Sequence, residues 1–526
     1  MQSDVLIIGS GGAGLSAALN AHKLGAKVKV VSKEYPTRSQ TCMAQGGINA
    51  ALGNMKEDSV ESHIQNTLKS AHALANESQV RVLCQEAPNA IEWLDSIGVC
   101  FSRTSESKIA QRTLGGASAP RACYAQDYTG LKILHTLYDN CLKEGIEMLS
   151  EYYLLELLTD KERELRVVGA AFLNIRTGEV ESFYAKSVIV ATGGYSRIYG
   201  KYSTNSSAST GDGVAAALRA GANISDMEFV QFHPTALKNS SVLISESARG
   251  AGGYLLNSQG ERFTNELAPR DEVARAIYSE MQKGEEIFLD IRHLGEEFIN
   301  EELPQERKLA KLYESVDPLY ELIPIKPAAH YTMGGIDVDE NSETSMKGLF
   351  AVGECANHHV HGANRLGGNS LLEIVVFGKE VAKSAFEYSK NAQEHRALTS
   401  QINPFEKVKE YSREIDFYKV KEQLGDIFYS NMGIVREKNS LERALEFVLK
   451  NLSEVHKMGI NDSSKIYNTN LVEFLEFINT LELSKVMLQS ALAREESRGA
   501  HFRSDFTQES DTFAKSSIYN KNGVVA

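Results

Sequence analysis

The beginning of the chain alternates between short apolar runs and glycine-rich segments. Residues 4–8 (DVLII) form an apolar run without polar alternation, which is typical of a strand buried on both faces of a parallel sheet. Residues 15–24 have a helical pattern that ends at Gly25, and residues 26–32 predict a second strand. These segments together predict a β–α–β unit at the start of the fold.

Two later segments repeat the pattern of a short strand followed by glycine. They are residues 187–194 (SVIVATGG) and 348–354 (GLFAVGE). We expect their strands to join the first sheet, because one sheet can recruit strands from distant parts of a chain. The stretch between them, about residues 226–333, is then expected to be an inserted domain.

The C-terminal part is rich in charge, poor in glycine and helical in period. One helical face carries Leu441, Ala444, Leu445, Val448 and Leu449, and a second helix is predicted from residue 471 to about 498. The final segment, roughly the last 20 residues, is polar, and we expect it to be frayed or packed on a partner.

Composition narrows the classes of function. The 526 residues carry a net charge of −13, which argues against a nucleic-acid ligand. No apolar run approaches the ~18 residues of a membrane span, so we expect no direct membrane insertion and a cytoplasmic location. The six cysteines form no C-x-x-C pair, so we expect no metal site and no iron–sulfur cluster within the chain.

The motif Gly9-x-Gly11-x-x-Gly14 lies between the first strand and the first helix. Its glycines allow a tight turn, a close approach of the backbone to a pyrophosphate, and close helix–strand packing. The motif therefore predicts a dinucleotide site, the alternative being a turn with incidental glycines. The second strand ends in Ser32 and Lys33 instead of an acidic residue, which suits FAD better than NAD.

Four separate segments place cationic side chains beside glycine or proline. Their central residues are His233, Arg270, His330 and Arg365. Two histidines and two arginines that converge would bind a small dianion, because arginine binds carboxylates with two hydrogen bonds. Each residue by itself is more often structural.

These segments resemble the flavoprotein subunit of the succinate dehydrogenase and fumarate reductase family, with L-aspartate oxidase as a near relative. The resemblance runs from residue 4 to about residue 503. It rests on residues 38–41 (RSQT), 44–47 (AQGG), 191–194 (ATGG), 210–213 (TGDG), 226–235 (DMEFVQFHPT), 245–250 (SESARG), 330–335 (HYTMGG), 364–370 (NRLGGNS) and 494–501 (REESRGAH).

The resemblance implies an α/β fold with three parts. A Rossmann-like FAD-binding domain, residues 1–228 and 334–392, is interrupted by an α+β capping domain, residues 229–333, and is followed by a C-terminal helical domain, residues 393–526. His233 and Arg270 are expected on or near the cap and Arg365 on the FAD side, so that closure of the cap assembles the site and expels water.

The resemblance also implies interconversion of fumarate and succinate, with hydride exchanged between flavin N5 and one alkene carbon. His233, Ser245, Glu246, His330 and Arg365 match substrate-binding positions. The catalytic positions are Arg270, the proton donor or acceptor, with Glu246 and Arg249 as its relay and His233 beside them. The two relay residues lie three apart, which suits one helical face, although an ordinary ion pair has the same spacing.

The same resemblance assigns the contacts to FAD. The expected cofactor-binding residues are Gly9, Gly11, Gly12, Ala13, Gly14, Ser32, Lys33, Ser39, Gln40, Thr41, Gln45, Gly46, Gly47, Ala191, Thr192, Gly193, Asp212, Glu354, Arg365, Ser370 and Leu371.

Gln40 departs from the family pattern. Respiratory members carry a histidine there that binds FAD covalently, and glutamine has no nucleophilic ring nitrogen. We therefore expect noncovalent FAD, a lower flavin potential and a tilt toward fumarate reduction.

Two other functions fit parts of the sequence. L-aspartate oxidase, which makes iminoaspartate for NAD biosynthesis, also lacks that histidine, but residues 114–117 (LGGA) lack the carboxylate expected there. Residues 291–295 (IRHLG) and 365–370 also look more like the dicarboxylate reductases. A non-catalytic flavin-binding assembly protein is the third hypothesis. For the first choice we expect an iron–sulfur subunit as partner and, through it, a membrane anchor at the cytoplasmic face of the inner membrane.

Overall fold

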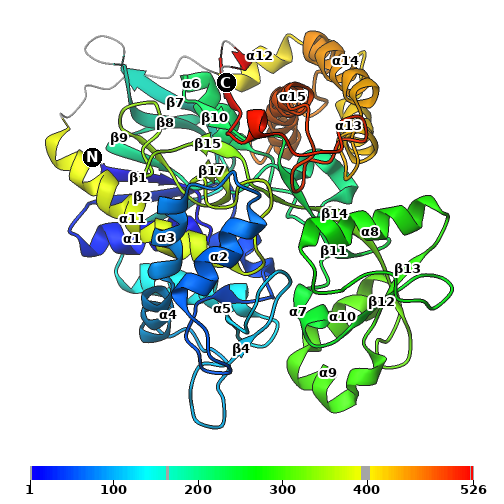
Figure 1. Ribbon diagram of the computed structural model, residues 1–526. Helices are drawn as coiled ribbons and strands as arrows, with labels where there is room; N and C mark the ends of the chain where they lie inside the picture. The colour runs from blue at the N-terminus through cyan, green and yellow to red at the C-terminus, as the bar shows by residue number, and fades with distance from the viewer. Residues whose placement is uncertain (1–2, 161–164, 393–402, 522, 525–526) are drawn as a thin grey trace.

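The computed structural model describes residues 3–160, 165–392, 403–521 and 523–524 (Figure 1). A large mixed sheet has the strand order β6-β2-β1-β9-β8-β7, and β16 also pairs with β9. β2 pairs in parallel with β6 and β1, and β9 pairs in parallel with β1 and β16. β8 pairs antiparallel with both β9 and β7. The strands are β1 (Ser3–Ile8), β2 (Val28–Ser32), β6 (Glu147–Ser150), β7 (Tyr152–Asp160), β8 (Arg166–Asn174), β9 (Val180–Val190) and β16 (Leu349–Ala351).

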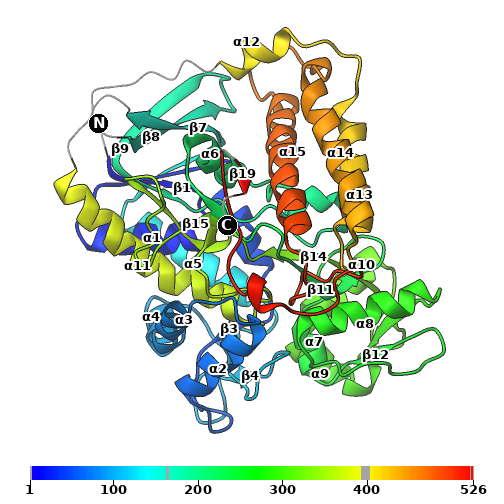
Figure 2. The ribbon, with the colours of Figure 1, turned by 45° about the horizontal axis from the view of Figure 1, so that its top comes forward.

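Helices α1 (Gly12–Lys23) and α11 (Asn369–Asn391) pack against each other beside the parallel part of this sheet (Figures 1 and 2). Helix α5 (Thr129–Lys143) packs on α1 in turn. Most residues of α1 are buried, because the helix contacts the sheet on one side and these two helices on others. The predicted β–α–β unit is confirmed, with α1 beginning at Gly12 instead of residue 15.

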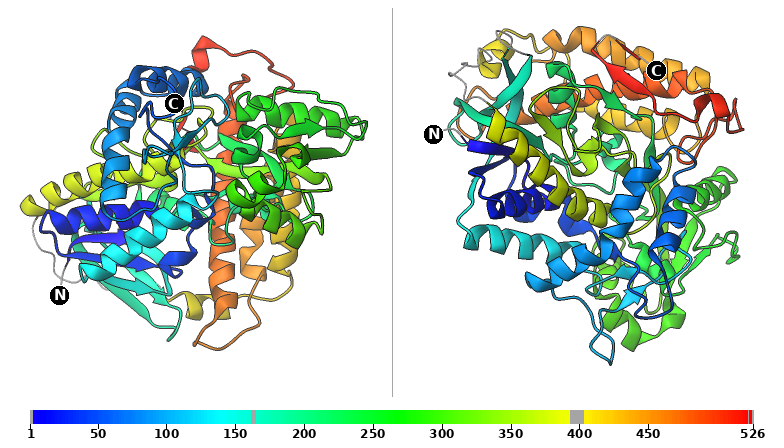
Figure 3. Two further views of the ribbon diagram at one scale, coloured as in Figure 1. Left: turned by 90° about the horizontal axis from the view of Figure 1, so that it is seen from below. Right: turned by 60° about the vertical axis from the view of Figure 1, so that its left-hand side comes forward.

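A second lobe is built on the antiparallel sheet β11-β14-β13-β12 and is drawn in green in Figure 3. It has its own apolar core, which includes Leu237, Val273, Ile277, Leu289 and Ile325. Its elements are β11 (Val230–Leu237), α7 (Glu246–Gly250), β12 (Tyr254–Leu256), α8 (Arg270–Gln282), β13 (Ile287–Asp290), α9 (Glu296–Glu302), α10 (Pro304–Tyr313) and β14 (Ile323–Thr332).

Three long helices lie side by side in the C-terminal part, as Figure 2 shows. They are α13 (Phe417–Asn431), α14 (Lys438–Glu454) and α15 (Thr469–Ala493), preceded by the short α12 (Pro404–Lys409). Leu441, Ala444 and Val448 are buried as predicted, but Leu449 is 43% exposed. The second helix ends at Ala493 and not near residue 498. The arginines that follow leave the helical path to form buried ion pairs, such as Arg494 with Glu228 at 2.6 Å.

The polar segment near residue 518 is not frayed, so that part of the prediction is wrong, whereas its packing on a partner stays a prediction. Strand β18 (Ile518–Asn520) pairs antiparallel with β10 (Ile224–Ser225) in the sheet order β17-β15-β10-β18-β19. The hydroxyl of Ser517 donates to Glu228, and the Ser517 N–H donates to Asp226 at 3.0 Å. The segment therefore satisfies buried carboxylates of this chain.

These layers confirm the predicted α/β fold class, with a second lobe inserted in the chain and helices in the C-terminal part. The exact domain boundaries remain predictions, and the one at 392/393 adjoins residues 393–402, which lie outside the described residues. Within the described part of the chain, every helix is too short or too polar to cross a membrane.

Candidate active site

The glycine motif forms the turn between β1 and α1. Gly9 has a φ of 111°, which favours glycine, and a Cβ there would overlap the carbonyl oxygen of Ala191. A Cβ on Gly14 would overlap the carbonyl oxygen of Gly9. A Cβ on Gly11 would meet only ordinary contacts, the nearest at 3.5 Å from Ser39. Gly9 and Gly14 are thus needed for packing, whereas Gly11 leaves an open approach to the backbone.

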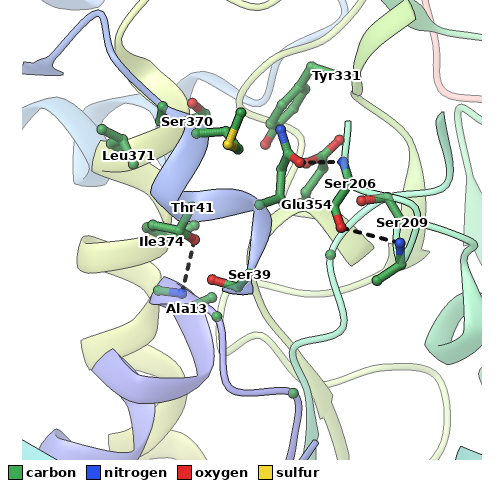
Figure 4. Close-up of a pocket in the computed structure, with 18 of the residues that line it drawn as sticks. Ala13, Ser39, Thr41, Ser206, Ser209, Tyr331, Glu354, Ser370, Leu371 and Ile374 are labelled. Carbon is green, nitrogen blue, oxygen red and sulfur yellow. Dashed lines mark hydrogen bonds between the residues drawn. The ribbon is translucent and has the colours of Figure 1, made fainter. Parts of the chain in front are cut away.

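A long pocket begins at this turn and ends between the two lobes; Figure 4 shows part of its lining. Of the predicted cofactor residues, only Gly14 is missing from its wall, because Gly14 packs against the carbonyl of Gly9. The predicted residues that line it at the cofactor end are Gly9, Gly11, Gly12, Ala13, Ser32, Lys33, Ser39, Gln40, Thr41, Gln45, Gly46, Gly47, Ala191, Thr192, Gly193, Asp212, Glu354, Ser370 and Leu371.

Several polar atoms in this wall are buried without a hydrogen-bond partner among the described residues. They are the hydroxyls of Ser39 and Thr192 and both side-chain polar atoms of Gln45. Burying polar groups without partners is costly, so such atoms are typical of a ligand site. Together with the open backbone at Gly11, they fit the phosphates and the ring edge of FAD.

Gln40 and Thr41 hold the backbone around this end of the pocket. The Oε1 of Gln40 accepts a hydrogen bond from the Ser206 N–H at 2.6 Å, and Thr41 Oγ1 accepts from the Gly12 N–H at 3.0 Å (Figure 4). Gln40 thereby ties the loop at 206–209 to the pocket. This contact gives the glutamine a role in shaping the wall.

Lys33 is held by carboxylates of this chain. Its Nζ lies 2.6 Å from Asp212 and 2.5 Å from Glu476, which comes from α15. Burial lowers the pKa of Lys33, but the two carboxylates raise it more, so the net direction is upward. A direct contact between Lys33 and a diphosphate stays a prediction.

Glu354 faces the same end of the pocket from the turn after β16. Its Oε1 accepts hydrogen bonds from the N–H of Thr332 at 3.0 Å and from its hydroxyl at 3.2 Å. Burial raises the pKa of Glu354 to about 7, against these hydrogen bonds, which lower it.

The other end of the pocket gathers the four predicted cationic residues. The ring centroids of His233 and His330 are 4.9 Å apart. One neutral oxygen, Gln231 Oε1, accepts from Arg270 Nη1 at 3.1 Å and from Arg365 Nη2 at 3.1 Å. Arg270 is also paired with Glu246, whereas Arg365 has no ion-pair partner among the described residues, so the Arg365 guanidinium leaves a positive charge in the pocket.

Burial and the neighbouring cations set the protonation of these groups. Burial, followed by the charge of Arg270, lowers the pKa of His233 and of His330 well below the usual range. The same causes lower the pKa of Arg365 to about 10. At neutral pH the site therefore combines neutral imidazoles with charged guanidinium groups, which suits a dicarboxylate.

Glu246 lies between the two arginines of the predicted relay. Its Oε2 accepts from Arg270 Nε at 2.9 Å and Nη2 at 2.5 Å, and its Oε1 lies 3.6 Å from Arg249 Nη2. Burial raises the pKa of Glu246, but the charges of Arg270 and Arg249 lower it by more, so the net pKa is lowered and the carboxyl group stays ionised. Gly115 donates its N–H to Oε1 at 2.7 Å, and a Cβ on Gly115 or Gly367 would overlap the carboxylate.

Local structure explains these positions. Ser245 caps α7, where its hydroxyl accepts from the Ser247 N–H at 3.2 Å, so Glu246 begins the helix and Arg249 falls one turn later. Arg270 is the first residue of α8, directly after Pro269. Ser245, Glu246 and Arg270 line the pocket, whereas Arg249 lies behind Glu246.

Several lining residues were not predicted. Leu114 and Leu243 add apolar wall to the pocket, and Ser206 and Ser209 line it as well. Tyr331 lies under Arg365, with the guanidinium carbon 4.2 Å from the ring centroid. Tyr331 and Leu243 carried a signal through their proximity in sequence to His330 and Ser245, and Leu114 begins the segment 114–117 that the sequence analysis compared with L-aspartate oxidase.

Comparisons with known proteins agree along the chain. Residues 4–371 match the family described as "FAD binding domain", and residues 421–525 match "Fumarate reductase flavoprotein C-term". The chain is 40% identical to the succinate dehydrogenase flavoprotein subunit of Rickettsia conorii, over 97% of this chain and 91% of the relative. It is also 40% identical to the 8-methylmenaquinol:fumarate reductase flavoprotein subunit of Wolinella succinogenes, over 98% and 88%. A solved structure of E. coli quinol fumarate reductase matches with a TM-score of 0.93 at 34% identity, over 100% of this chain and 96% of that chain.

Proposed function

The chain belongs to the succinate dehydrogenase and fumarate reductase flavoprotein family, and from that premise we propose which of its residues carry the reaction. It is an FAD-dependent oxidoreductase, the flavoprotein subunit for interconversion of fumarate and succinate. The observation that supports the residue assignment most directly is the placement of Arg270 and Arg365 on one amide oxygen, in the pocket that the glycine turn begins.

Four residues bind the dicarboxylate in this proposal. Arg365, His233 and His330 hold the two carboxylates, and Ser245 adds a hydroxyl near the start of α7. Neutral imidazoles donate one hydrogen bond each without adding charge, so the arginines dominate the attraction. Leu114 and Leu243 exclude water from the alkene, which strengthens these polar contacts.

Arg270 moves the proton. FAD, when bound, supplies or accepts the hydride of the reaction. During fumarate reduction Arg270 donates a proton from its guanidinium to the second alkene carbon and is reprotonated through Glu246 and Arg249. An arginine with a reference pKa of roughly 12.5 is a weak acid. In this proposal the contact between Arg270 and Glu246 at 2.5 Å provides the route by which a proton returns to Arg270 after each turnover.

The assignment is tested by Arg270→Ala with fumarate and a reduced dye as electron donor. We expect turnover to fall by about 10²- to 10⁴-fold, while FAD content and the binding of malonate, an unreactive dicarboxylate, remain unchanged. Activity equal to that of the unmodified protein would rule out Arg270 as the proton donor.

We also propose that FAD is bound noncovalently, because Gln40 offers no nucleophile and its Oε1 is engaged by Ser206. The flavin potential is then lower than in a covalent relative, which favours fumarate reduction. Acid precipitation should release the yellow flavin into the supernatant and leave an unmodified polypeptide by mass spectrometry. Flavin retained in the pellet would contradict this proposal.

The electron partner in this proposal is an iron–sulfur subunit, which links the flavoprotein to a membrane anchor. It rests on the relatives, whose names describe subunits of succinate dehydrogenase and menaquinol:fumarate reductase. The test is to isolate the protein from its native cells. If it is neither bound to the membrane fraction nor elutes together with iron, this proposal is contradicted.

L-aspartate oxidation is not adopted. Leu114 lines the dicarboxylate end of the pocket, and residues 114–117 bring no carboxylate there for a substrate ammonium. Hydrogen peroxide formed from L-aspartate by the purified protein would reverse this choice.

A further inference from the structure

A buried cluster behind Tyr331 has no place in the reaction described above. Tyr331 is in β14, and its hydroxyl donates to Glu373 Oε2 at 2.5 Å. His361 Nε2 lies 3.1 Å from the same oxygen, and His358 Nδ1 lies 3.5 Å from Oε1. Each of the four residues is at most 6% exposed, although Tyr331 also lines the pocket.

Glu373 is fixed from several directions. It is the fifth residue of α11, in a buried stretch of that helix. His358 stacks on Phe377 of the same helix, with ring centroids 4.2 Å apart, and its Nε2 lies 3.2 Å from Ser342 Oγ. A carboxylate that is buried in this way holds its partners in one geometry, because any displacement would leave a charge unpaired.

Arg365 lacks this kind of support. Among the described residues no carboxylate lies within ion-pair distance of its guanidinium, and its buried Nε has no hydrogen-bond partner. Its position is set by Gln231 Oε1 on one edge and by the face of Tyr331 at 4.2 Å. A phenol that donates to a carboxylate has a more electron-rich ring, and a guanidinium over such a ring is held more strongly.

We propose that Glu373 is a positioning residue for Arg365 and acts through Tyr331, so that α11 sets the affinity of the dicarboxylate site. The Glu373 carboxylate orients and polarises the Tyr331 ring, and the ring holds the guanidinium against the pocket. Glu373 itself does not touch the substrate. The inference rests on the proposed role of Arg365 in binding a carboxylate.

The test uses Glu373→Gln, Tyr331→Phe and the double variant in the FAD-loaded protein. Each single change should raise the KM for fumarate and the Kd for malonate about 5- to 10-fold, with kcat changed by less than about 3-fold. Malonate binding is measured from the flavin absorbance, so only FAD-containing molecules are counted. Because both residues act along one path, the double variant should bind malonate no more weakly than the weaker single variant.

The control is Tyr199→Phe, which also removes a buried phenol hydrogen bond, from Tyr199 to the carbonyl of Met432 at 2.9 Å, outside the pocket wall. It should lower stability without changing malonate affinity. If Glu373→Gln and Tyr331→Phe only lower Tm or FAD content and leave KM and Kd unchanged, Glu373 is structural and the inference fails. Full additivity in the double variant also refutes it. If Glu373→Gln does not fold, Tyr331→Phe with unchanged malonate affinity is sufficient to reject it.

Arg365→Ala separates this failure from failure of the proposed function. Loss of malonate binding in Arg365→Ala, with normal binding in Glu373→Gln, rejects only the role of Glu373. Normal binding in Arg365→Ala rejects the assignment of Arg365 itself.

Discussion

The two ends of the pocket are built in different ways. At the cofactor end, close packing of backbone excludes side chains at Gly9 and Gly14, where a Cβ would overlap the carbonyl oxygens of Ala191 and Gly9. At the dicarboxylate end, Arg270, Arg365 and Glu246 come from three separate segments and are held by charge and hydrogen bonds. The difference indicates that the first end is limited by fit and the second by electrostatics, so they should respond differently to substitution.

The sharpest test of the electrostatic end is Glu246→Gln. The amide keeps the shape of the side chain but cannot return a proton to Arg270, so kcat should fall by about 10²- to 10⁴-fold. Because Arg249 and Arg270 lose their buried counterion, Tm should fall as well, so kcat is expressed per FAD-containing molecule. Glu280→Gln is the matched control, because Glu280 lies on α8 and pairs with Lys283 at 2.5 Å, away from the pocket wall. If kcat falls equally in Glu246→Gln and Glu280→Gln, the loss is not specific to the pocket and the contrast between its two ends is wrong.

The glycine end is tested by Gly14→Ala beside Gly11→Ala. A methyl group on Gly14 collides with the carbonyl of Gly9, which should destabilise even the FAD-free protein by about 1–3 kcal/mol. A methyl group on Gly11 meets no protein atom closer than 3.5 Å, so it should weaken FAD binding and leave the FAD-free protein as stable as before. Denaturant titrations with and without FAD distinguish the two outcomes. Identical behaviour of both variants would contradict the packing argument.

Glu476→Gln tests whether the carboxylate that pairs with Lys33 at the cofactor end contributes to stability and not to the reaction. It removes one of the two carboxylates that hold Lys33, and we expect a loss of about 1–2 kcal/mol in stability with unchanged fumarate kinetics. The control is Glu482→Gln on the same helix, where the ion pair with Arg219 is partly exposed and contributes little. Differential scanning calorimetry of both variants gives the answer. A lower kcat or a higher KM in Glu476→Gln would show that Lys33 contributes to the reaction and not only to stability.

The smallest effect concerns pH. Glu306 of α10 accepts from the Ser245 N–H at 3.0 Å, and burial, followed by the nearby Asp127, raises its pKa to about 8. A carboxyl group whose pKa is raised in the folded state contributes stability at low pH, and this contribution is lost as the pH rises through about 8. Glu306→Gln should therefore flatten the decline of Tm between about pH 5 and pH 8. An unchanged Tm profile would show that Glu306 does not titrate in this range.

The same contrast explains what could be predicted from sequence. The turn at Gly9–Gly14 is specified by adjacent residues, so spacing alone indicates it. The meeting of Arg270 and Arg365 on Gln231 depends on how β11, α8 and the segment before α11 pack, and spacing gave no measure of it. The pairing of Lys33 with Glu476 joins residues that are far apart in the chain, and nothing in the sequence around either residue indicated this pairing.

The end of α15 shows the same limit. The apolar pattern predicts a helix through residue 498, but Arg494 leaves the helix to reach Glu228. A buried ion pair outweighs helical propensity there, and its partner lies in a different part of the fold. Tyr331 was missed for a related reason, since its contact with Arg365 comes from tertiary packing.

The pairing of β18 with β10 has a consequence for biosynthesis. Strand β10 is made midway through translation, and its antiparallel partner emerges from the ribosome only much later. Until then the edge of β10 and the carboxylates of Asp226 and Glu228 lack the groups that later cover them. Folding of this region is therefore completed only after residues 517–520 have been made, because they cover both the strand edge and the two carboxylates.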